Sequence, residues 1–229
     1  MNEMLWATLL VINFGCILAA YRFWGRVGLF IWIPVSVIIA NIQVLKTVEL
    51  FGVVATLGNI VYAGSFLVTD ILSENYGKRD AARGVGIGFL SMIAMVALMN
   101  LALAFTPHSS DFAHESLETL FTIMPRIAAA SLIAYLISQM HDIWAYHLWK
   151  TKKPGTRYIW LRNNLSTLVS QLIDSVLFSL IAFYGVFDTR VLIEIVITTY
   201  VFKWVVAVLD TPFIYLAAHW KAGGRISET

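Results

Sequence analysis

The sequence contains little charge and almost no cysteine. Charged residues make up 13% of the 229 residues, against 59% hydrophobic residues, and the formal net charge is only +2. The basic residues are confined to a few short stretches, so the chain lacks the basic face that nucleic-acid binding requires. The single cysteine, Cys16, lies in an apolar run, so no disulfide can form within one chain, and we expect a small buried apolar residue.

Signatures of an intramembrane enzyme or of a metalloprotein are also missing. The chain has no His-Glu-x-x-His motif, which membrane zinc proteases use. Serines within apolar runs, such as Ser170, have no clear histidine at matching depth to activate them. The loop 107–119 contains His108, His114 and Glu115, but their spacing matches no established metal site, and a solvated loop is expected. We therefore expect a protein that is not an enzyme and that uses no metal or cofactor.

What the sequence does contain is long apolar runs. A bilayer core about 30 Å thick is crossed by about 20 helical residues, and continuous runs of that length favour helices. No basic region precedes the first run, as it would in a cleavable signal peptide, so this run is expected to remain as a span. We predict one all-α membrane domain, 1–229, a polytopic bundle of six to seven transmembrane helices drawn from Leu5–Tyr21, Val27–Val44, Phe51–Ile71, Gly84–Thr106, Leu120–Trp149, Leu165–Phe187 and Val191–Ala218.

The second apolar segment is the least regular. It is short, contains Pro34 and ends in Asn41, after which Lys46 and Glu49 follow. A broken or partly re-entrant helix is therefore an alternative to a full span here.

The basic residues predict the orientation in the membrane. Under the positive-inside rule, loops rich in Lys and Arg stay in the cytoplasm. Only Lys46 and Arg190 lie in the loops of the opposite side, which places the C-terminus inside and the N-terminus outside. The predicted inner segments hold twelve of the 16 Lys and Arg residues, namely Arg22, Arg26, Lys78, Arg79, Arg83, Lys150, Lys152, Lys153, Arg157, Arg162, Lys221 and Arg225.

Two of the apolar segments carry the same polar pattern, Ser-Gln-x-x-Asp. It occurs at Ser138–Asp142 and again at Ser170–Asp174, and in both the amide and the acid lie three residues apart on one helix face. A carboxylate at the centre of a membrane helix costs roughly 2.5–3.5 kcal/mol on insertion scales. We therefore expect Gln139, Asp142, Gln171 and Asp174 to face the bundle interior.

Other charged residues lie inside or at the ends of the predicted spans. Asp70 and Glu74 are one turn apart, and Glu74 has the alternative of pairing with the basic residues that follow it at the helix end. Arg126 either extends to the outer interface or pairs inside the bundle. Lys203 requires an acidic partner, and the sequence does not choose among Asp70, Asp142, Asp174 and Glu194.

Together these residues indicate a polar cavity for a solute. Polar contacts between membrane helices contribute only about 0.6 kcal/mol each on average, so bundle cohesion does not by itself account for the whole set, although about half of such residues are expected to be mainly structural. Carboxylates accept hydrogen bonds, amides both donate and accept, and Trp144, Phe178 or Tyr200 could stack on a flat ring. A planar heterocycle such as a purine-like base fits best, while amino acids, drugs and ions remain compatible.

Several motifs follow one another in a characteristic order along the chain. They are Asn41 itself, TDILSENYG at 69–77 followed by Ala81–Arg83, PRIAAASLIAYLISQMHD at 125–142, STLVSQLIDSVLFSLIAFYG at 166–185, and Tyr200–Lys203 before Thr211 and Pro212. Together, from about Asn41 to Tyr215, they resemble the queuosine precursor transporter family of bacterial inner membranes.

This resemblance implies secondary uptake of 7-deazaguanines, such as preQ0, preQ1 or queuine, for tRNA modification. It also implies a helix bundle similar to the substrate-capture subunits of energy-coupling-factor vitamin transporters, and a role as such a subunit is the alternative function, together with a carrier of another planar solute. The energy source of uptake, a proton or simple equilibration, stays open. Gly84, Gly86 and Gly88 would allow helices to approach closely, either within the bundle or across a homodimer. The implied substrate-binding residues are Asn41, Asp70, Glu74, Arg126, Gln139, Asp142, Gln171, Asp174 and Lys203.

Overall fold

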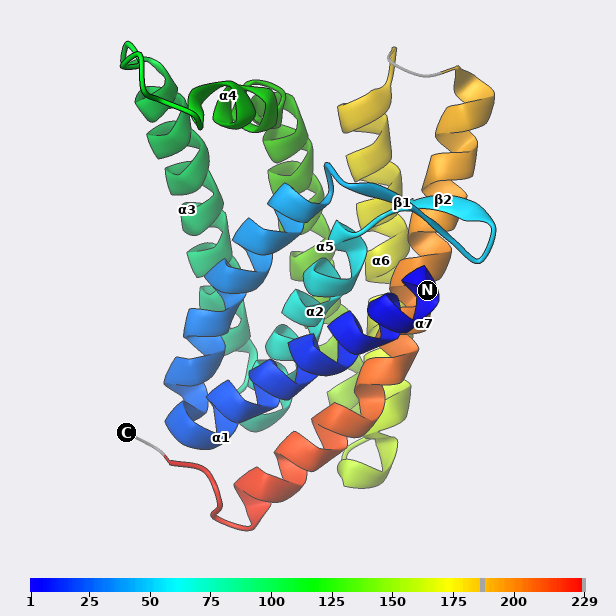
Figure 1. Cartoon of the computed structure of the whole chain (residues 1–229). Coiled ribbons are helices and arrows are strands. Elements are labelled where there is room, and N and C mark those ends of the chain that lie inside the picture. The colour runs from blue at the N-terminus through cyan, green and yellow to red at the C-terminus, as the bar shows by residue number, and fades with distance from the viewer. Residues whose placement is uncertain (186–187, 228–229) are drawn as a thin grey trace.

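The computed structural model describes residues 1–185 and 188–227 of the chain (Figure 1). Within this part it contains seven α-helices, one 3₁₀ turn at Thr156–Tyr158 and a single two-stranded sheet. The elements are α1 (Asn2–Gln43), β1 (Thr47–Leu50), β2 (Val53–Thr56), α2 (Gly58–Asn75), α3 (Lys78–Leu103), α4 (His114–Thr122), α5 (Met124–Lys152), α6 (Ile159–Phe183) and α7 (Thr189–Ala222).

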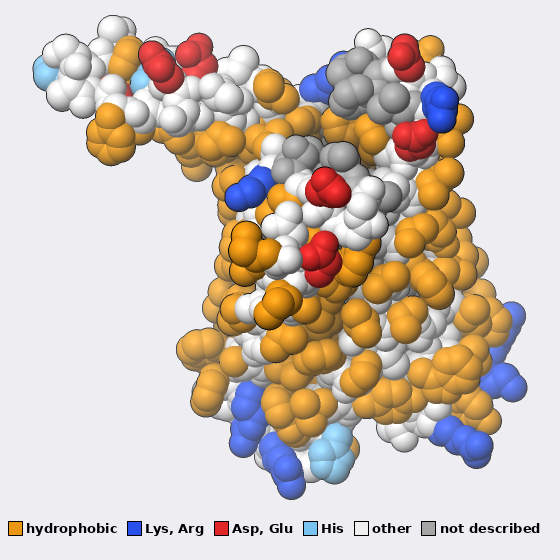
Figure 2. Space-filling model, turned by 45° about the vertical axis from the view of Figure 1, so that its right-hand side comes forward, with side chains coloured by type: hydrophobic (Ala, Val, Ile, Leu, Met, Phe, Trp, Pro, Cys, Tyr) orange, Lys and Arg blue, Asp and Glu red, His pale blue; other side chains and the backbone are white. Residues whose placement is uncertain are grey.

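Length and surface composition identify an all-α membrane protein, as expected. Four helices, α1, α3, α6 and α7, are long and apolar enough to cross a membrane, and α4 with α5 form a fifth candidate span. Outward faces expose large aliphatic side chains, such as Leu90 at 67% and Ile197 at 54%. Figure 2 shows hydrophobic side chains over most of the middle of one face, with Lys and Arg gathered at its lower end. Such extended apolar surface is favourable against lipid and unfavourable in water.

Helix α1 consists of two arms that meet at a sharp bend. A straight helix of its 42 residues would be about 63 Å long, roughly twice the thickness of a bilayer core. The chain turns back at Gly25, whose φ of 52° and ψ of −132° are not helical (Figure 1). The predicted segments Leu5–Tyr21 and Val27–Val44 are these two arms. The second arm is not broken at Pro34, since the helix continues to Gln43.

The third predicted segment, Phe51–Ile71, is wrong at its beginning. Residues 47–56 form an antiparallel hairpin in which Leu50 pairs with Val53, and the helix begins only at Gly58. Phe51 and Gly52, with φ of 51° and 78°, form the two-residue turn. A hairpin turn of this kind requires positive φ at both positions, which the glycine adopts without cost. The apolar composition of so short a run does not distinguish strand from helix, and this is why the helix was extended too far.

Helix α2 lies at the centre of the bundle. Every residue from Gly58 to Ser73 is buried, and α1, α3, α5 and α7 all contact the helix. Because no face is left for lipid, α2 can carry polar residues such as Ser65, Thr69 and Asp70 throughout its length. This central helix positions most of the polar groups described below.

The fifth predicted segment, Leu120–Trp149, is interrupted rather than continuous. Helix α4 ends at Thr122, α5 begins at Met124, and the two are bent by 42°. Pro125 lies in the first turn of α5, where a missing backbone N–H is tolerated, whereas in a helix interior it would break the hydrogen-bond ladder. The sixth segment, Leu165–Phe187, agrees with α6 up to Phe183, and its last two residues lie outside the described part.

Two glycines of α3 permit close packing inside the bundle. A Cβ atom at Gly84 would lie 2.5 Å from Ile33, and one at Gly88 would lie 2.7 Å from the Tyr135 hydroxyl. A Cβ at Gly86 would meet no heavy atom within 4 Å. Of the two alternatives for this stretch, Gly84 and Gly88 therefore serve packing within one chain.

The stretches richest in basic residues lie at one end of the bundle. Figure 1 places the bend of α1, the α2–α3 and α5–α6 connections and the end of α7 together at its lower end. The α3–α4 connection, the end of α6 and the start of α7 lie at the opposite end. We call the lower end the basic end.

Candidate functional site

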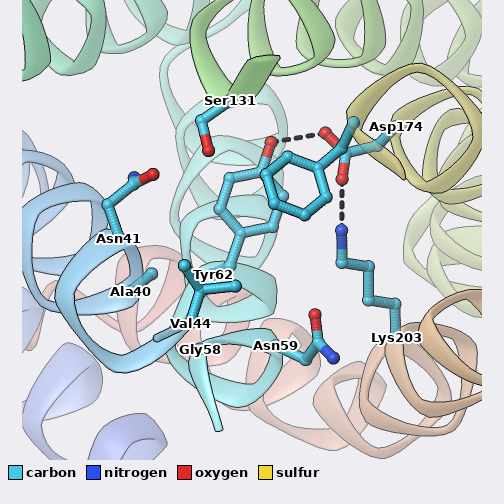
Figure 3. A pocket seen from close by; sticks show the side chains of 10 residues that line it. Ala40, Asn41, Val44, Gly58, Asn59, Tyr62, Ser131, Asp174 and Lys203 are labelled. Carbon is cyan, nitrogen blue, oxygen red and sulfur yellow. Dashed lines mark hydrogen bonds and ion pairs between the residues drawn. The ribbon is translucent and has the colours of Figure 1, made fainter. Parts of the chain in front are cut away.

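A pocket lies where five helices meet near the end of α1. Its cavity volume is only about 30 Å³, well below the roughly 300–1,000 Å³ usual for small-molecule sites, so the walls must move apart before a solute can enter. The end of α1, the first turns of α2, the first third of α5, the second half of α6 and the middle of α7 form its walls (Figure 3). The lining residues are Ala40, Asn41, Val44, Gly58, Asn59, Tyr62, Ser131, Asp174, Phe178 and Lys203.

A buried ion pair forms one wall of this pocket. The Lys203 ammonium contacts the Asp174 carboxylate, and the two side chains are only 4% and 2% exposed. The Tyr62 hydroxyl donates a hydrogen bond of 2.6 Å to the other carboxylate oxygen, and Ser138 donates to the same oxygen over 3.2 Å. Asp174 therefore has a donor on each oxygen, which offsets the cost of burying its charge.

Aromatic rings surround the cation of this pair. The Lys203 nitrogen lies 4.7 Å from the centre of the Tyr62 ring and 5.9 Å from the centre of the Phe178 ring. These are cation–π distances, so the rings stabilise the charge while presenting flat apolar surface to the pocket. Of the three aromatic residues considered for stacking, only Phe178 lines this pocket; Trp144 is 53% exposed.

A polar group faces the ion pair from the other side. Asn41, at the end of α1, lies across the pocket from Asp174 and Lys203 (Figure 3). Its amide nitrogen donates to the Val37 carbonyl over 2.8 Å, while its oxygen has no hydrogen-bond partner among the described residues. The pocket thus offers an anion, a cation and an open amide oxygen around aromatic walls, which is suited to a flat solute with both donor and acceptor edges.

The two glutamines of the repeated pattern lie behind the pocket and do not line it. Gln139 accepts a hydrogen bond of 3.2 Å from Thr69 and donates one of 3.3 Å to Ser65, both on α2. Gln171 is fully buried, and neither of its polar side-chain atoms has a partner within the described residues. Gln139 therefore joins α5 to the central helix, whereas Gln171 has spare hydrogen-bonding capacity.

Three fully buried aspartates lie closer to the basic end than the pocket does. Asp142 on α5 and Asp210 on α7 both face Asp70 on α2. Asn163 of α6 donates a hydrogen bond of 2.8 Å to Asp210. We call Asp70, Asp142 and Asp210 the carboxyl cluster.

The basic end is closed by a second ion pair. Arg162, of which only 1% is exposed, donates to Glu74 over 2.7 Å and to the carbonyls of Lys153 and Gly155 over 3.0 and 2.8 Å. Tyr146 also donates to Glu74, over 3.1 Å. Of the two roles considered for Glu74, pairing with basic residues at the helix end is the one observed.

The nine residues that the resemblance implies for substrate binding do not form a single site. Only Asn41, Asp174 and Lys203 line the pocket. Arg126 lies at the opposite end, where it is exposed and donates to the carbonyls of Ile181 and Tyr184 over 3.2 and 2.7 Å at the end of α6. Within the described residues, no group of three or more side chains is arranged to hold a metal ion.

Some lining residues were not singled out from the sequence. Tyr62 was missed because a tyrosine in an apolar helix is usually a packing residue, and Asn59 because its segment was treated as an apolar span. Ser131 carries no motif. One sign of a polar face was present in the sequence. Tyr62 and Asp70 lie about two helical turns apart, and Ser65 and Thr69 lie between them on the same helix.

Comparison with known proteins identifies relatives that are named transporters. A family model described as "Putative vitamin uptake transporter" matches residues 56–217. The "Probable queuosine precursor transporter" of Bacillus subtilis (strain 168) is 41% identical over 216 residues, which cover 94% of each chain. The "Queuosine precursor transporter" of Escherichia coli (strain K12) is 27% identical over 173 residues, covering 74% of this chain and 75% of that one. No solved structure matches the chain.

The matched region contains nearly all of α2 to α7, and hence most of the pocket, the carboxyl cluster and the closed basic end. The family model matches more than half of the chain, and the first relative is 41% identical over almost its whole length. These two matches establish the family. The chain belongs to the vitamin uptake transporter family that includes queuosine precursor transporters, and the resemblance of its motifs is confirmed.

Proposed function

We propose that this protein is a secondary transporter that imports queuosine precursors, 7-deazaguanines such as preQ0, preQ1 or queuine, and that the pocket beside Asp174 and Lys203 binds the base. The names of the two relatives support the substrate class. The observation that carries the site is the buried Asp174–Lys203 pair with Tyr62 and Phe178 around it.

The chemistry of a deazaguanine edge matches these groups. Its ring N–H and exocyclic amine are adjacent donors, which a carboxylate such as Asp174 accepts together, and its carbonyl is an acceptor for the Lys203 ammonium. The flat ring would lie against Phe178 and Tyr62. Binding would then exchange the direct ion pair for two contacts with the solute, so that neither buried charge is left without a partner.

The placement in the membrane is also part of the proposal. The bundle would cross the bacterial inner membrane seven times, with the two arms of α1 and the helix α2 each counted as one crossing, because termini on opposite sides require an odd number. The basic end would face the cytoplasm together with the C-terminus, and the N-terminus would lie on the outer side, as the positive-inside rule requires. The pocket would then be on the outer side of the carboxyl cluster, with the Glu74–Arg162 pair closing the inner side.

Binding and uptake by the purified protein test this proposal. We expect 7-deazaguanines to raise the thermal unfolding temperature of the wild type, while adenine does not. Asp174→Asn and Lys203→Met should remove this stabilisation, and Glu194→Gln, at an exposed pair on α7, should retain it. Equal, negligible shifts with every deazaguanine would refute the substrate class.

Transport by the protein alone distinguishes the proposal from its alternative. In liposomes that contain only this protein, we expect uptake of a labelled deazaguanine without ATP. In cells that cannot synthesise the precursor, the wild type should restore queuosine in tRNA, whereas Asp174→Asn should not. Uptake that appears only with an ATP-hydrolysing partner would instead identify the chain as a substrate-capture subunit.

A further inference from the structure

The carboxyl cluster has an unusual charge balance. Asp70 and Asp142 are fully buried, and the donors beside their carboxyl groups are neutral hydroxyls, that of Thr167 next to both and those of Ser166 and Ser170 next to Asp142. The described ion pairs include neither of these two residues nor Asp210. Three adjacent carboxylates without a cation would be prohibitively unfavourable in a membrane protein interior.

The surrounding groups do not compensate this charge. On α2 and α6, the nearby Glu74 and Arg162 pair with one another, and towards the pocket Asp174 pairs with Lys203. On α5, Tyr146 donates to Glu74. The His141 ring contacts the Ser170 hydroxyl over 2.8 Å, so the expectation that Ser170 has no histidine at matching depth is wrong. Each nearby cation is thus engaged elsewhere.

An independent group points into the same space. The Thr167 hydroxyl of α6 is fully buried and lies within hydrogen-bonding reach of both Asp70 and Asp142. Asp70 and Asp142 also lie close enough to share a hydrogen bond, which requires a proton on one of them. Two facing carboxyl groups that share one proton form a stable arrangement where two carboxylates do not.

We propose that Asp70 and Asp142, with Asp210 and Thr167 beside them, form a proton-binding site that is separate from the substrate pocket and couples substrate import to proton entry. The coupling half of this proposal rests on the proposed function, whereas the proton site does not. The proton enters from the outer side with the substrate and leaves at the basic end, and no other bond changes.

The position of the cluster suits such coupling. Asp70 is eight residues beyond Tyr62 on α2, and Asp210 is seven residues beyond Lys203 on α7, so both lie roughly 10–12 Å nearer the basic end. Asp142 is one turn from Ser138, whose hydroxyl contacts Asp174. A change in the carboxyl cluster can therefore reach the ion pair of the pocket through α5.

Infrared difference spectroscopy of the purified protein tests the proton site without a substrate. A buried protonated carboxyl group gives a C=O stretching band that is distinct from that of a carboxylate. We expect this band in the wild type, a clear decrease in Asp70→Asn and in Asp142→Asn, and an unchanged band in Asp174→Asn, where the carboxylate is paired with Lys203. An identical band in the wild type and both cluster variants would overturn the proposal.

Liposome uptake tests the coupling. With one proton per neutral deazaguanine, accumulation should rise about tenfold per unit of inward pH gradient, because one pH unit and a tenfold concentration ratio correspond to equal free energies. Asp142→Asn should still equilibrate labelled substrate but lose this accumulation, and Asp70→Asn provides the second variant if the first fails to fold. Accumulation that follows a sodium gradient at constant pH would overturn the proton assignment.

The two proposals fail in different ways. If the wild type transports no deazaguanine, the proposed function is wrong, and the infrared bands still decide whether the cluster holds a proton. If uptake occurs but ignores the pH gradient in the wild type, the function stands and the coupling is wrong.

Discussion

The Lys203 ammonium and the Asp174 carboxylate form an ion pair that is almost completely excluded from solvent, with the two residues on neighbouring helices α7 and α6. Removing one member of a buried pair leaves an uncompensated charge and typically costs about 3–5 kcal/mol. We therefore expect Lys203→Met or Asp174→Asn to lower the unfolding temperature of the purified protein markedly.

The double variant separates stability from binding. Asp174→Asn combined with Lys203→Met leaves no unpaired charge, so it should recover much of the stability lost in each single variant, while ligand binding remains absent. Glu194→Gln is the matched control, because its partner Arg190 is 91% exposed and such surface pairs contribute about 0–1 kcal/mol. A double variant no more stable than the worse single one would contradict this account.

A second prediction concerns the hydroxyl of Tyr62. Tyr62→Phe keeps the ring beside Lys203 but removes the 2.6 Å hydrogen bond to Asp174. Hydrogen bonds to charged groups contribute roughly 1.5–3 kcal/mol, so we expect deazaguanine affinity to fall about tenfold or more by calorimetry. Ser138→Ala removes a longer bond to the same oxygen, outside the pocket lining, and should have a smaller effect. The reverse order would argue against Tyr62 as the main support of Asp174.

A third prediction uses the glycines of the bundle. A Cβ at Gly58 would lie 2.4 Å from the backbone oxygen of Ala40, so Gly58→Ala must push α2 away from α1 at the pocket. We expect a loss of about 1–3 kcal/mol in stability together with weaker ligand binding. Gly86→Ala, where the Cβ meets open space in the middle of a helix, should stabilise the protein by up to about 1 kcal/mol. Thermal unfolding of both variants provides the measurement.

A fourth prediction concerns the closed basic end. Arg162 uses its planar fork to hold Glu74 and two carbonyls of the 153–155 turn at once. A lysine keeps the charge but has no such fork, so Arg162→Lys should release the turn. We expect trypsin to cleave the 151–157 loop faster in this variant than in the wild type. Arg83→Lys, at a pair where the arginine is 68% exposed, should leave the cleavage rate unchanged.

The sequence identified the chemistry of the interior better than its geometry. The cost of charge in lipid was enough to select Asp70, Asp142, Asp174 and Lys203, all of which are buried. It could not choose the partner of Lys203, because that depends on how α6 and α7 are rotated against each other. Periodicity on a single helix does not contain this information.

Two predictions from the sequence, for Arg162 and for Phe51, are wrong because each depends on the immediate surroundings of one residue. The basic residues around Arg162 predict a basic loop there, whereas Arg162 is the most deeply buried arginine of the described residues. Phe51 was placed in a helix because its run is apolar, whereas positive φ at Phe51 and Gly52 forms a hairpin turn. Composition averaged over a segment predicts a span well, but a single residue at a segment end depends on its tertiary contacts.

The burial of α2 also bears on how the chain is assembled in the membrane. With Asn59, Asp70 and Glu74 in its 18 residues, this helix is not among those apolar enough to enter a bilayer unaided. Its first flanking helices, α1 and α3, are available early in synthesis, but α5 and α7, which cover its remaining sides, are made later, and α7 is the last helix of the chain. A nascent chain released before α7 would therefore hold a polar helix with one side unsheltered.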